Sequence, residues 1–307
     1  MNYRHAFHAG NFADVFKHIM LTRILDYLKR KPAPMRFIDT HAGIGGYDLS
    51  SEESQRTGEW RNGIALLLEA ECPDEVAQLL KPYFDVVGRG IPVPADPQRP
   101  GRYPGSPVLA QALLRPLDKL IFCELHPSDI RKLNRNIGKD RRVKVIEIDG
   151  YTGLRAYVPP LERRGLVLID PPFEKPDEFS SLARNLVEAW QKWPTGTYCV
   201  WYPLKAVPEV NRFFRTLTDA GISDVLCLEL SVGQSKITDE PSRSGLSNNG
   251  LSNNGLSNNG LAIINPPYVL EEEARLILPF LCDTLARGPG ANWRIDKVSA
   301  EHAPSRH

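Results

Sequence analysis

The chain contains little cysteine, and its cysteines are isolated. Five occur in 307 residues, none of them in a Cys-x-x-Cys pair: Cys72, Cys123, Cys199, Cys227 and Cys282. An odd number of scattered thiols argues against a disulfide framework and against a cysteine-ligated zinc site. We therefore expect free thiols and a cytoplasmic protein.

Long apolar runs and an excess of charge of one sign are also absent. No run approaches the roughly 20 apolar residues of a membrane-spanning helix, and the first residues lack the apolar core of a signal peptide. We therefore expect no membrane partner. The 38 Lys and Arg residues nearly balance the 37 Asp and Glu residues. A nucleic-acid surface has to consist of local basic clusters, such as Lys29-Arg30-Lys31, rather than a global positive charge.

Short apolar runs alternate with helical patterns along most of the chain. This alternation predicts an α/β fold with a seven-stranded, mostly parallel sheet. The predicted strands lie at 35–40, 119–124, 143–148, 165–169, 197–202, 225–232 and 261–265. The predicted helices outside the gap between the first two strands lie at about 12–31, 127–137, 177–192, 205–219 and 271–286.

The gap between the first two predicted strands is unusually long. It holds about eighty residues, whereas a crossover between parallel strands needs about a dozen. Helical patterns and a Pro/Gly-rich connector occupy it. We therefore predict a helical insertion subdomain at 50–118, placed on the ligand-binding edge of the sheet, and a core formed by 1–49 and 119–290.

A tandem repeat precedes the last predicted strand. Residues 245–260 are three copies of Gly-Leu-Ser-Asn-Asn followed by Gly. Repeat architectures need enough stacked units to bury a continuous core, and three Asn/Gly-rich pentapeptides are too few. We expect a flexible surface loop at 243–260 that carries no chemistry.

The tetrapeptide Asp170-Pro171-Pro172-Phe173 directly follows the apolar run 165–169. The carboxyl ends of parallel strands are where ligands bind in open α/β sheets. There, the Asp170 carboxylate and the Pro171 carbonyl can accept the two N–H groups of a planar amine, and Phe173 can stack on its ring. The tetrapeptide resembles the catalytic motif of methyltransferases that act on exocyclic amines, although Asp-Pro-Pro also occurs as an ordinary turn after a strand.

A second copy, Asn265-Pro266-Pro267-Tyr268, resembles the same kind of motif. It follows the seventh predicted strand, after three further strand–helix units. Its position argues against a catalytic role, so we assign catalysis to Asp170 rather than Asn265.

Other strand ends carry residues suited to a nucleoside cofactor. A glycine-containing turn with Gly43 follows the first strand, Glu124 ends the second and Asp149-Gly150 ends the third. Glycines allow close approach of the backbone to a ligand, Glu124 is suited to two ribose hydroxyls, and Asp149 to the amino group of an adenine. The glycine turn alone fits a nicotinamide cofactor equally well. Together with Asp170, the order resembles the S-adenosylmethionine site of amino-methyltransferases.

Longer strings carry a closer resemblance, which extends from Tyr3 to about Pro267. The chain resembles the bacterial 23S ribosomal RNA adenine-N6 methyltransferases of the RlmJ type, a Rossmann-like, cytoplasmic family with a helical insertion. The strings are Tyr3-Arg4-His5-Ala6-Phe7-His8-Ala9-Gly10-Asn11, Ala13-Asp14-Val15, Lys17-His18, Asp39-Thr40-His41-Ala42-Gly43, Arg56-Thr57-Gly58-Glu59, Tyr103-Pro104-Gly105-Ser106-Pro107, Glu124-Leu125-His126-Pro127-Ser128-Asp129 and Trp201-Tyr202-Pro203.

The resemblance implies which residues serve the reaction. It implies catalysis by Asp170, Pro171 and Phe173, and contact between Tyr3 and the RNA. It also implies S-adenosylmethionine contacts by His18, His41, Ser106, Glu124, Asp149, Gly150 and Asp170, and the glycine turn adds Gly43 to the expected cofactor-binding residues. Two features depart from the family pattern: Phe173 stands where tyrosine is more usual, and the pentapeptide repeat is foreign to it.

Alternative functions remain open at this level. His5, His8, His18 and His41 with Asp14 lack the spacing of a metal site, so we expect no metal. A DNA adenine-N6 methyltransferase shares the chemistry, a nicotinamide oxidoreductase shares the glycine turn, and a non-catalytic RNA-binding assembly factor shares the predicted partner. We expect a monomer that acts on 23S ribosomal RNA.

Overall fold

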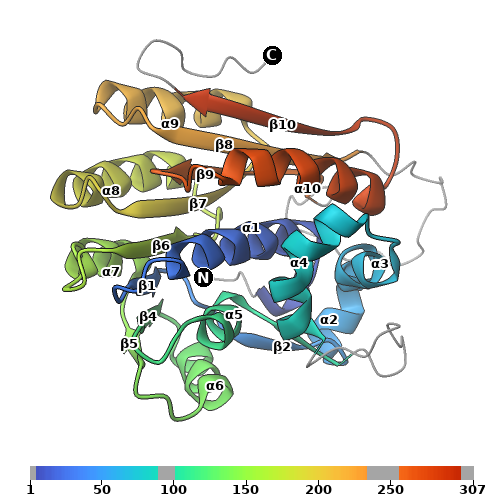
Figure 1. The fold of residues 1–307 in the computed structure, drawn as a ribbon, viewed down its shortest axis with the longest axis horizontal. Coiled ribbons are helices and arrows are strands. Elements are labelled where there is room, and N and C mark those ends of the chain that lie inside the picture. The colour runs from blue at the N-terminus through green and yellow to red at the C-terminus, as the bar shows by residue number, and fades with distance from the viewer. Residues whose placement is uncertain (1–4, 89–100, 234–255, 299–307) are drawn as a thin grey trace.

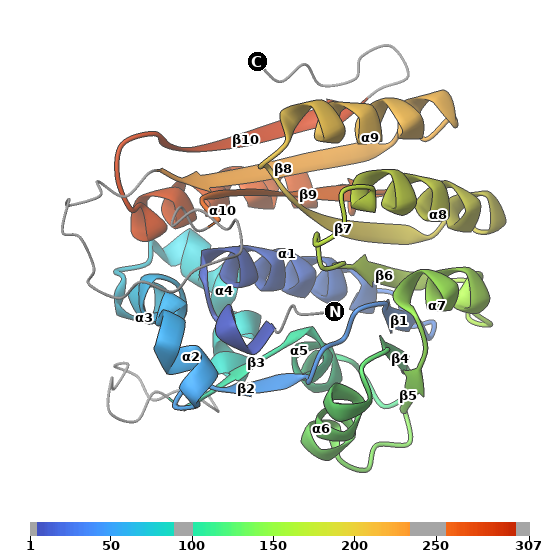
Figure 2. The ribbon, with the colours of Figure 1, turned by 180° about the vertical axis from the view of Figure 1, so that it is seen from behind.

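The computed structural model describes residues 5–88, 101–233 and 256–298. An eight-stranded sheet runs through them, and its strands can be followed in Figures 1 and 2. Its order is β10-β8-β9-β7-β6-β1-β4-β5. The strands are β1 (Arg36–Asp39), β4 (Lys119–Glu124), β5 (Val143–Glu147), β6 (Gly165–Ile169), β7 (Thr197–Pro203), β8 (Val225–Val232), β9 (Asn258–Ile264) and β10 (Ala291–Val298).

Five neighbouring strands, from β5 to β7, are parallel, and β9 is antiparallel to both β7 and β8. The predicted α/β fold with a mostly parallel sheet is confirmed, and all seven predicted strands are present. The eighth strand, β10, pairs antiparallel with β8 at the edge of the sheet. It gave no sequence signal because it is half-exposed and polar, with an ion pair between Arg294 and Asp296.

Helices cover both faces of the sheet. In Figure 1 the viewer faces α1, α4, α5 and α10, whereas α7, α8 and α9 lie in front in Figure 2. The helices of the first face, together with α6, have these residue ranges: α1 (Phe12–Lys29), α4 (Asp74–Val87), α5 (Ser106–Leu113), α6 (Pro127–Ile137) and α10 (Leu270–Leu285). Those on the second are α7 (Gly150–Tyr157), α8 (Glu178–Lys192) and α9 (Val207–Asp219).

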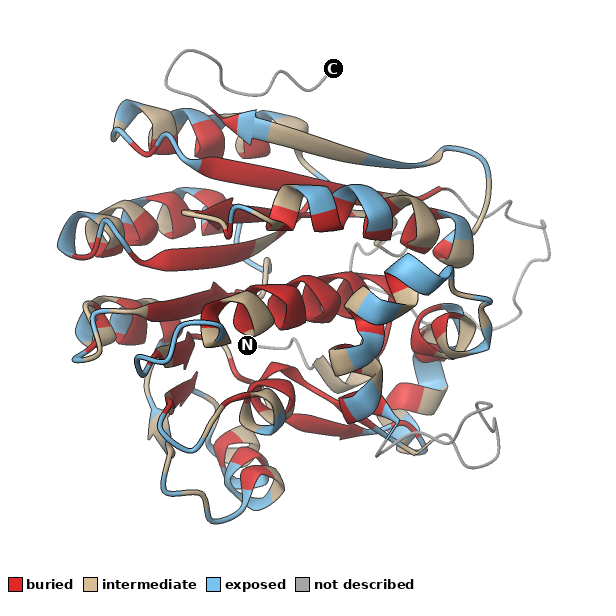
Figure 3. Cartoon of the chain, viewed as in Figure 1, coloured by how far each residue is buried: buried red, intermediate tan, exposed pale blue. Residues whose placement is uncertain are grey.

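Helix α1 is buried along most of its length, which Figure 3 shows as a nearly continuous red helix. Asn11 caps its first turn by accepting a hydrogen bond from the Asp14 amide, which satisfies one of the free N–H groups there. Apolar side chains surround most of the helix, yet Asp14, Lys17 and His18 are buried with them. Buried charges of this kind require partners, and these partners belong to the candidate site.

The segment between β1 and β4 adds a two-stranded sheet, β2 (Gly46–Asp48) with β3 (Arg102–Pro104), and short helices. Besides α4 and α5, these are α2 (Glu52–Thr57), η2 (Glu59–Asn62) and α3 (Ile64–Glu69). Apolar residues such as Leu67, Leu80 and Tyr83 belong to the same hydrophobic core as α1 and α10. The inserted helices therefore pack onto the sheet's own core.

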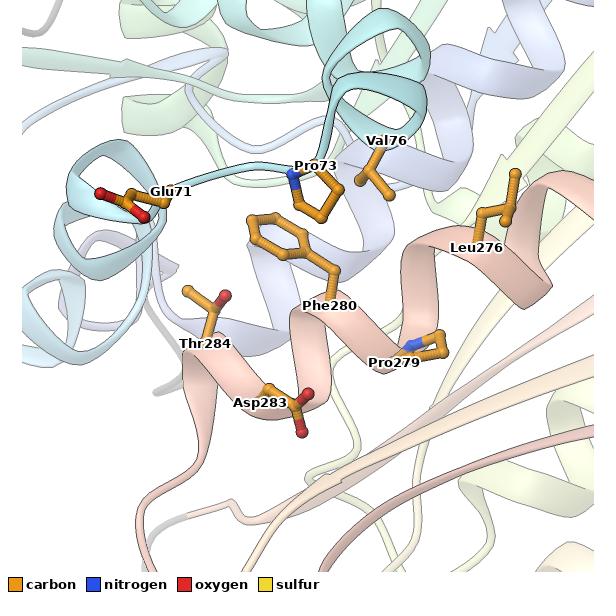
Figure 4. A pocket seen from close by; sticks show the side chains of 8 residues that line it. All are labelled: Glu71, Pro73, Val76, Leu276, Pro279, Phe280, Asp283 and Thr284. Carbon is orange, nitrogen blue, oxygen red and sulfur yellow. The ribbon is translucent and has the colours of Figure 1, made fainter.

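A surface pocket of about 530 Å³ lies where α10 faces the connection between α3 and α4 (Figure 4). The Phe280 ring extends toward Pro73, and Leu276 and Val76 line one side, while Glu71 and Asp283 supply negative charge. None of the predicted site residues lines this pocket.

The described end of the tandem repeat is a strand rather than a loop. Residues 243–255 lie outside the described residues, but Asn258, Asn259 and Gly260 begin β9. Asn258 pairs with β8, and Asn259 and Gly260 pair with both β7 and β8. Asn259 is fully buried, and a side chain at Gly260 would collide with the ring of Tyr202. The expected loop at 243–260 therefore ends before residue 258, where β9 begins, because pairing with β7 and β8 overrides the loop-like composition. Among the described helices, none is long and apolar enough to cross a membrane.

Candidate active site

Four carboxylates lie at one edge of the sheet. Asp39 and Glu124 are the last residues of β1 and β4, Asp170 directly follows β6, and Asp149 follows β5. Because β5, β4, β1 and β6 are parallel neighbours, their carboxyl ends meet at the same edge. The structure thus brings the three strand-end acids singled out in the sequence, Glu124, Asp149 and Asp170, together with Asp39 at the edge where α/β proteins bind ligands.

Asp170 is held by a lysine from the first helix. The Nζ atom of Lys17 lies 2.5 Å from Asp170 Oδ2 and 2.9 Å from Asp14 Oδ1. The Lys17 side chain is 5 % exposed and that of Asp170 is 19 % exposed. Asp14 also accepts hydrogen bonds from His5 Nε2 at 2.8 Å and from the Gly10 amide at 3.0 Å.

The charges in this cluster stabilise one another. Burial by itself lowers the pKa of Lys17, but Asp14 and Asp170 outweigh burial and raise it above its ordinary value. Burial raises the pKa of Asp14, but His5 and Lys17 bring it well below its ordinary value. Lys17 is therefore an ammonium ion at neutral pH. Reasoning from the sequence missed it as a site residue, although an Asp–Lys pair three residues apart in a mostly apolar helix is a usable signal.

Asp39 and Ser106 form a second buried contact beside this cluster. The Ser106 hydroxyl, at the start of α5, donates to Asp39 Oδ2 at 2.7 Å, and the His41 amide donates to Asp39 Oδ1 at 3.2 Å. Burial raises the pKa of Asp39 to about 7, although both hydrogen bonds favour the carboxylate. Asp39 was not among the predicted site residues, whereas Ser106 was.

Glu124 organises the glycine turn after β1. Its Oε2 accepts from the Gly43 amide at 2.9 Å and its Oε1 accepts from the His126 amide at 2.8 Å. Gly43 has a φ of +60°, a conformation that favours glycine. Burial raises the pKa of Glu124. A carboxylate has about four acceptor positions, so Glu124 retains capacity for a further donor.

The start of α7 approaches the end of β1 very closely. A side chain at Gly150 would collide with His41 and with the Thr40 carbonyl, so only glycine fits. Asp149 caps α7 by accepting from the Thr152 amide at 2.9 Å through Oδ1, and its other oxygen has no hydrogen-bond partner among the described residues. Burial lowers the pKa of His41 to about 4, so the imidazole is neutral at pH 7. In the described part of the chain, Asp149 therefore keeps one carboxylate oxygen as a free acceptor beside the closely packed backbone of Gly150.

His18 is turned toward the inserted segment. Its Nδ1 lies 2.8 Å from the Tyr103 hydroxyl, which lies 3.1 Å from the Tyr83 hydroxyl. All three side chains are buried. Burial lowers the pKa of His18 to about 3, so it is neutral. His18 is close to the cluster of charges, with Nε2 4.0 Å from Asp14 Oδ1.

Phe173 lies among other aromatic rings. Its ring centroid is 4.7 Å from that of Phe179 and 5.8 Å from that of Trp201. Phe173 is only partly buried and Pro171 is buried. No backbone amide in the described chain donates to the Pro171 carbonyl, so that carbonyl and Asp170 Oδ1 remain available as acceptors near the ring.

The second Pro-Pro motif is far from this edge. Because β9 runs antiparallel to β7, Asn265 lies at the opposite end of the sheet. Its side-chain Nδ2 donates to the Pro194 and Gly196 carbonyls, both at 2.7 Å, so the side chain stabilises the turn before β7. Tyr3 lies outside the described residues. Among the described residues, no group of three or more His, Cys, Asp or Glu side chains is placed to hold a metal ion.

Comparisons with known proteins identify one family. A family model described as "Ribosomal RNA large subunit methyltransferase D, RlmJ" matches residues 32–298. Two proteins named "Ribosomal RNA large subunit methyltransferase J" are similar over nearly their whole length. The Haemophilus influenzae protein is 36 % identical over 302 residues, 98 % of this chain and 100 % of the relative. The Escherichia coli protein is 38 % identical over 284 residues, 92 % of each chain.

A solved structure has the same fold. The crystal structure of a Legionella pneumophila protein superposes with a TM-score of 0.79 at 34 % identity, covering 95 % of this chain and 99 % of that one.

Proposed function

The chain belongs to the RlmJ family of ribosomal RNA large subunit methyltransferases, and we propose that it methylates the exocyclic N6 of an adenine in 23S ribosomal RNA. The observation that carries this proposal is the Asp170-Pro171-Pro172-Phe173 turn at the end of β6. It offers two unused acceptors, Asp170 Oδ1 and the Pro171 carbonyl, beside an aromatic ring. A planar amine with two N–H groups matches that set.

The residues at the strand ends fit S-adenosylmethionine, which supplies an electrophilic methyl group when it is bound. We assign its ribose hydroxyls to Glu124 and its adenine amino group to Asp149. We also assign cofactor contacts to the backbone at Gly43, which has a positive φ, and at Gly150, where only glycine fits beside His41. His18, His41, Ser106 and Asp170 complete the proposed contacts.

The reaction needs an activated amine. The N6 lone pair of adenine is delocalised into the ring, so the amine is a poor nucleophile. When Asp170 and the Pro171 carbonyl accept its N–H groups, the nitrogen becomes pyramidal and its lone pair becomes available. The acceptors also stabilise the positive charge that develops on nitrogen in the transition state. Lys17 binds the other oxygen of Asp170 and thereby fixes the direction of the carboxylate.

The methylated amine has to release a proton, and we assign its acceptance to Asp170. Lys17 already carries its proton, because its pKa is raised. Asp170 touches the amine directly and is the group that accepts the proton and passes it to solvent. The target base has to leave its stack to reach this site, and Phe173 offers a new stacking surface. We place Tyr3 against the RNA and propose that the enzyme acts as a cytoplasmic monomer.

Methyl transfer from tritiated S-adenosylmethionine tests the proposal. We expect label in 23S ribosomal RNA and not in duplex DNA, at N6 of one adenine when the RNA is digested and analysed by mass spectrometry. Asp170→Asn should fold and bind cofactor but transfer methyl groups at least about 10²-fold more slowly, the effect of losing one aimed electrostatic group. Normal turnover by Asp170→Asn together with loss in Asn265→Ala would reverse the assignment of the catalytic motif.

A further inference from the structure

We propose that the last copy of the Gly-Leu-Ser-Asn-Asn repeat is part of the active site, because its Asn259 positions Trp201 against Phe173. The inference rests on the proposed function, in which Phe173 stacks on the target base. It makes Asn259 a positioning residue that acts through Trp201, and it gives a purpose to a segment whose composition is that of a loop.

Asn259 is held rigidly. It is fully buried in β9, between β7 and β8, where it pairs with Pro203 and Leu230. Its Nδ2 donates to the Leu230 carbonyl at 3.3 Å. The backbone register and this hydrogen bond together fix where the side-chain oxygen points.

That oxygen binds the indole of Trp201. The Nε1 atom of Trp201 donates to Asn259 Oδ1 at 3.0 Å. A buried tryptophan N–H usually has a hydrogen-bond acceptor. The hydrogen bond to Asn259 therefore favours the observed orientation of the indole over others. Asn259 therefore selects one orientation of a ring that is only partly buried.

The orientation of Trp201 affects the catalytic motif. The ring centroids of Trp201 and Phe173 are 5.8 Å apart with an interplanar angle of 64°, and the Phe179 centroid lies 4.7 Å from that of Phe173. Phe173 is only partly buried, so contact with these two rings restricts its orientation. A chain of contacts thus leads from Asn259 through Trp201 to the surface on which the base stacks.

Position, rather than sequence, gives this copy its role. The three copies are identical, but β9 begins within the third. Removal of residues 245–254 leaves the same Gly-Leu-Ser-Asn-Asn-Gly string in front of Leu261. The chain therefore offers a matched control, since the same substitution can be made in the same pentapeptide at Asn249.

The experiment compares Asn259→Ala, Asn249→Ala and the deletion of 245–254 in the full chain, with in vitro transcribed 23S RNA as substrate. We expect kcat to fall about ten-fold in Asn259→Ala, as small misplacements of a reacting group do, with the Kd for S-adenosylmethionine unchanged. The other two variants should match the wild type. Equal kcat values for folded Asn259→Ala and Asn249→Ala would overturn the proposal.

A double-mutant cycle separates positioning from a general loss of packing. Trp201→Phe keeps a ring and removes the N–H group, so we expect Asn259→Ala to have no further effect on kcat in that background. Additive effects would refute the proposal. If Asn259→Ala does not fold, Trp201→Phe tests the same hydrogen bond, and an unchanged kcat would refute it. Failure of the wild type to methylate 23S RNA is a different result, because it refutes the proposed function itself.

Discussion

Replacing Lys17 by methionine tests how the buried charges hold the site together. The change keeps an unbranched side chain of similar length and removes only the ammonium group. That group is the contact between Asp14 on α1 and Asp170 after β6. Both the stability of the protein and its activity should therefore fall, for separate reasons.

The loss of stability follows from the partners that remain. Removing one member of a buried ion pair costs about 3–5 kcal/mol, because a charge is left without compensation. Here Asp14 keeps His5 and the Gly10 amide, and Asp170 is 19 % exposed, so water reaches it. We expect the lower end, about 3 kcal/mol in the free energy of unfolding. A domain of ordinary stability remains folded after such a loss.

The loss of activity follows from the freedom that Asp170 gains. Without the ammonium group its carboxylate can rotate away from the amine, which removes an aimed electrostatic group and costs about 10²-fold in kcat. The Kd for S-adenosylmethionine should change much less, since Glu124, Asp149 and the glycine backbone keep their contacts. Lys17→Arg retains the charge and should recover much of the stability.

Urea unfolding and single-turnover methyl transfer at saturating cofactor measure the two effects. Lys81→Met is the matched control, because Lys81 forms an exposed ion pair with Asp85 on α4, and such pairs contribute about 0.3–0.5 kcal/mol. If Lys17→Met and Lys81→Met have the same stability and the same kcat, the ion-pair cluster has no role in either, and the reasoning fails.

Three further outcomes are expected. Phe173→Ala should lose about 1–3 kcal/mol of transition-state stabilisation through lost stacking, read from kcat/KM, whereas Phe173→Tyr should stay active; an inactive tyrosine variant contradicts stacking. Gly150→Ala should weaken S-adenosylmethionine binding in calorimetry, since its methyl group would collide with His41; unchanged affinity refutes the close approach. For His18→Gln, we compare the free energy of unfolding with that of the wild type at two pH values. The difference, variant minus wild type, should increase by about 2 kcal/mol when the pH is lowered from 7.5 to about 5. In the folded wild type the pKa of His18 is about 3, whereas in the unfolded chain it has the ordinary histidine value of about 6.5. Below about pH 6.5 the unfolded chain therefore binds a proton that the folded protein does not, and falling pH destabilises the wild type. Asp39, whose pKa is raised to about 7, acts in the opposite direction in both proteins, so the difference between the two urea curves is the measurement; parallel curves contradict a buried neutral His18.

Much of the fold is encoded locally. The strand ending at Ile169 and the turn at Asp170 were recognisable because an apolar run and two prolines are adjacent in the sequence. The same holds for Glu124, which ends a strand, and for Asp149, which follows one shortly after its last residue. The parallel order of these strands then followed from their alternation with helices, since crossovers of this kind bring the carboxyl ends to one edge. The sequence by itself therefore determined the fold class and the acids at the strand ends.

The tertiary structure alone decided which side chains meet. Lys17 and Asp170 are 153 positions apart, and Trp201 and Asn259 are 58 apart. Neither contact has a local signal, because each depends on how α1 lies over the sheet or on how β9 enters between β7 and β8. The composition of the repeat predicted a loop for the same reason: Asn and Gly disfavour strands in isolation, and only the hydrogen bonds of two neighbouring strands make the last copy part of the sheet. Local chemistry thus fixed the candidates, and packing between distant segments fixed their partners.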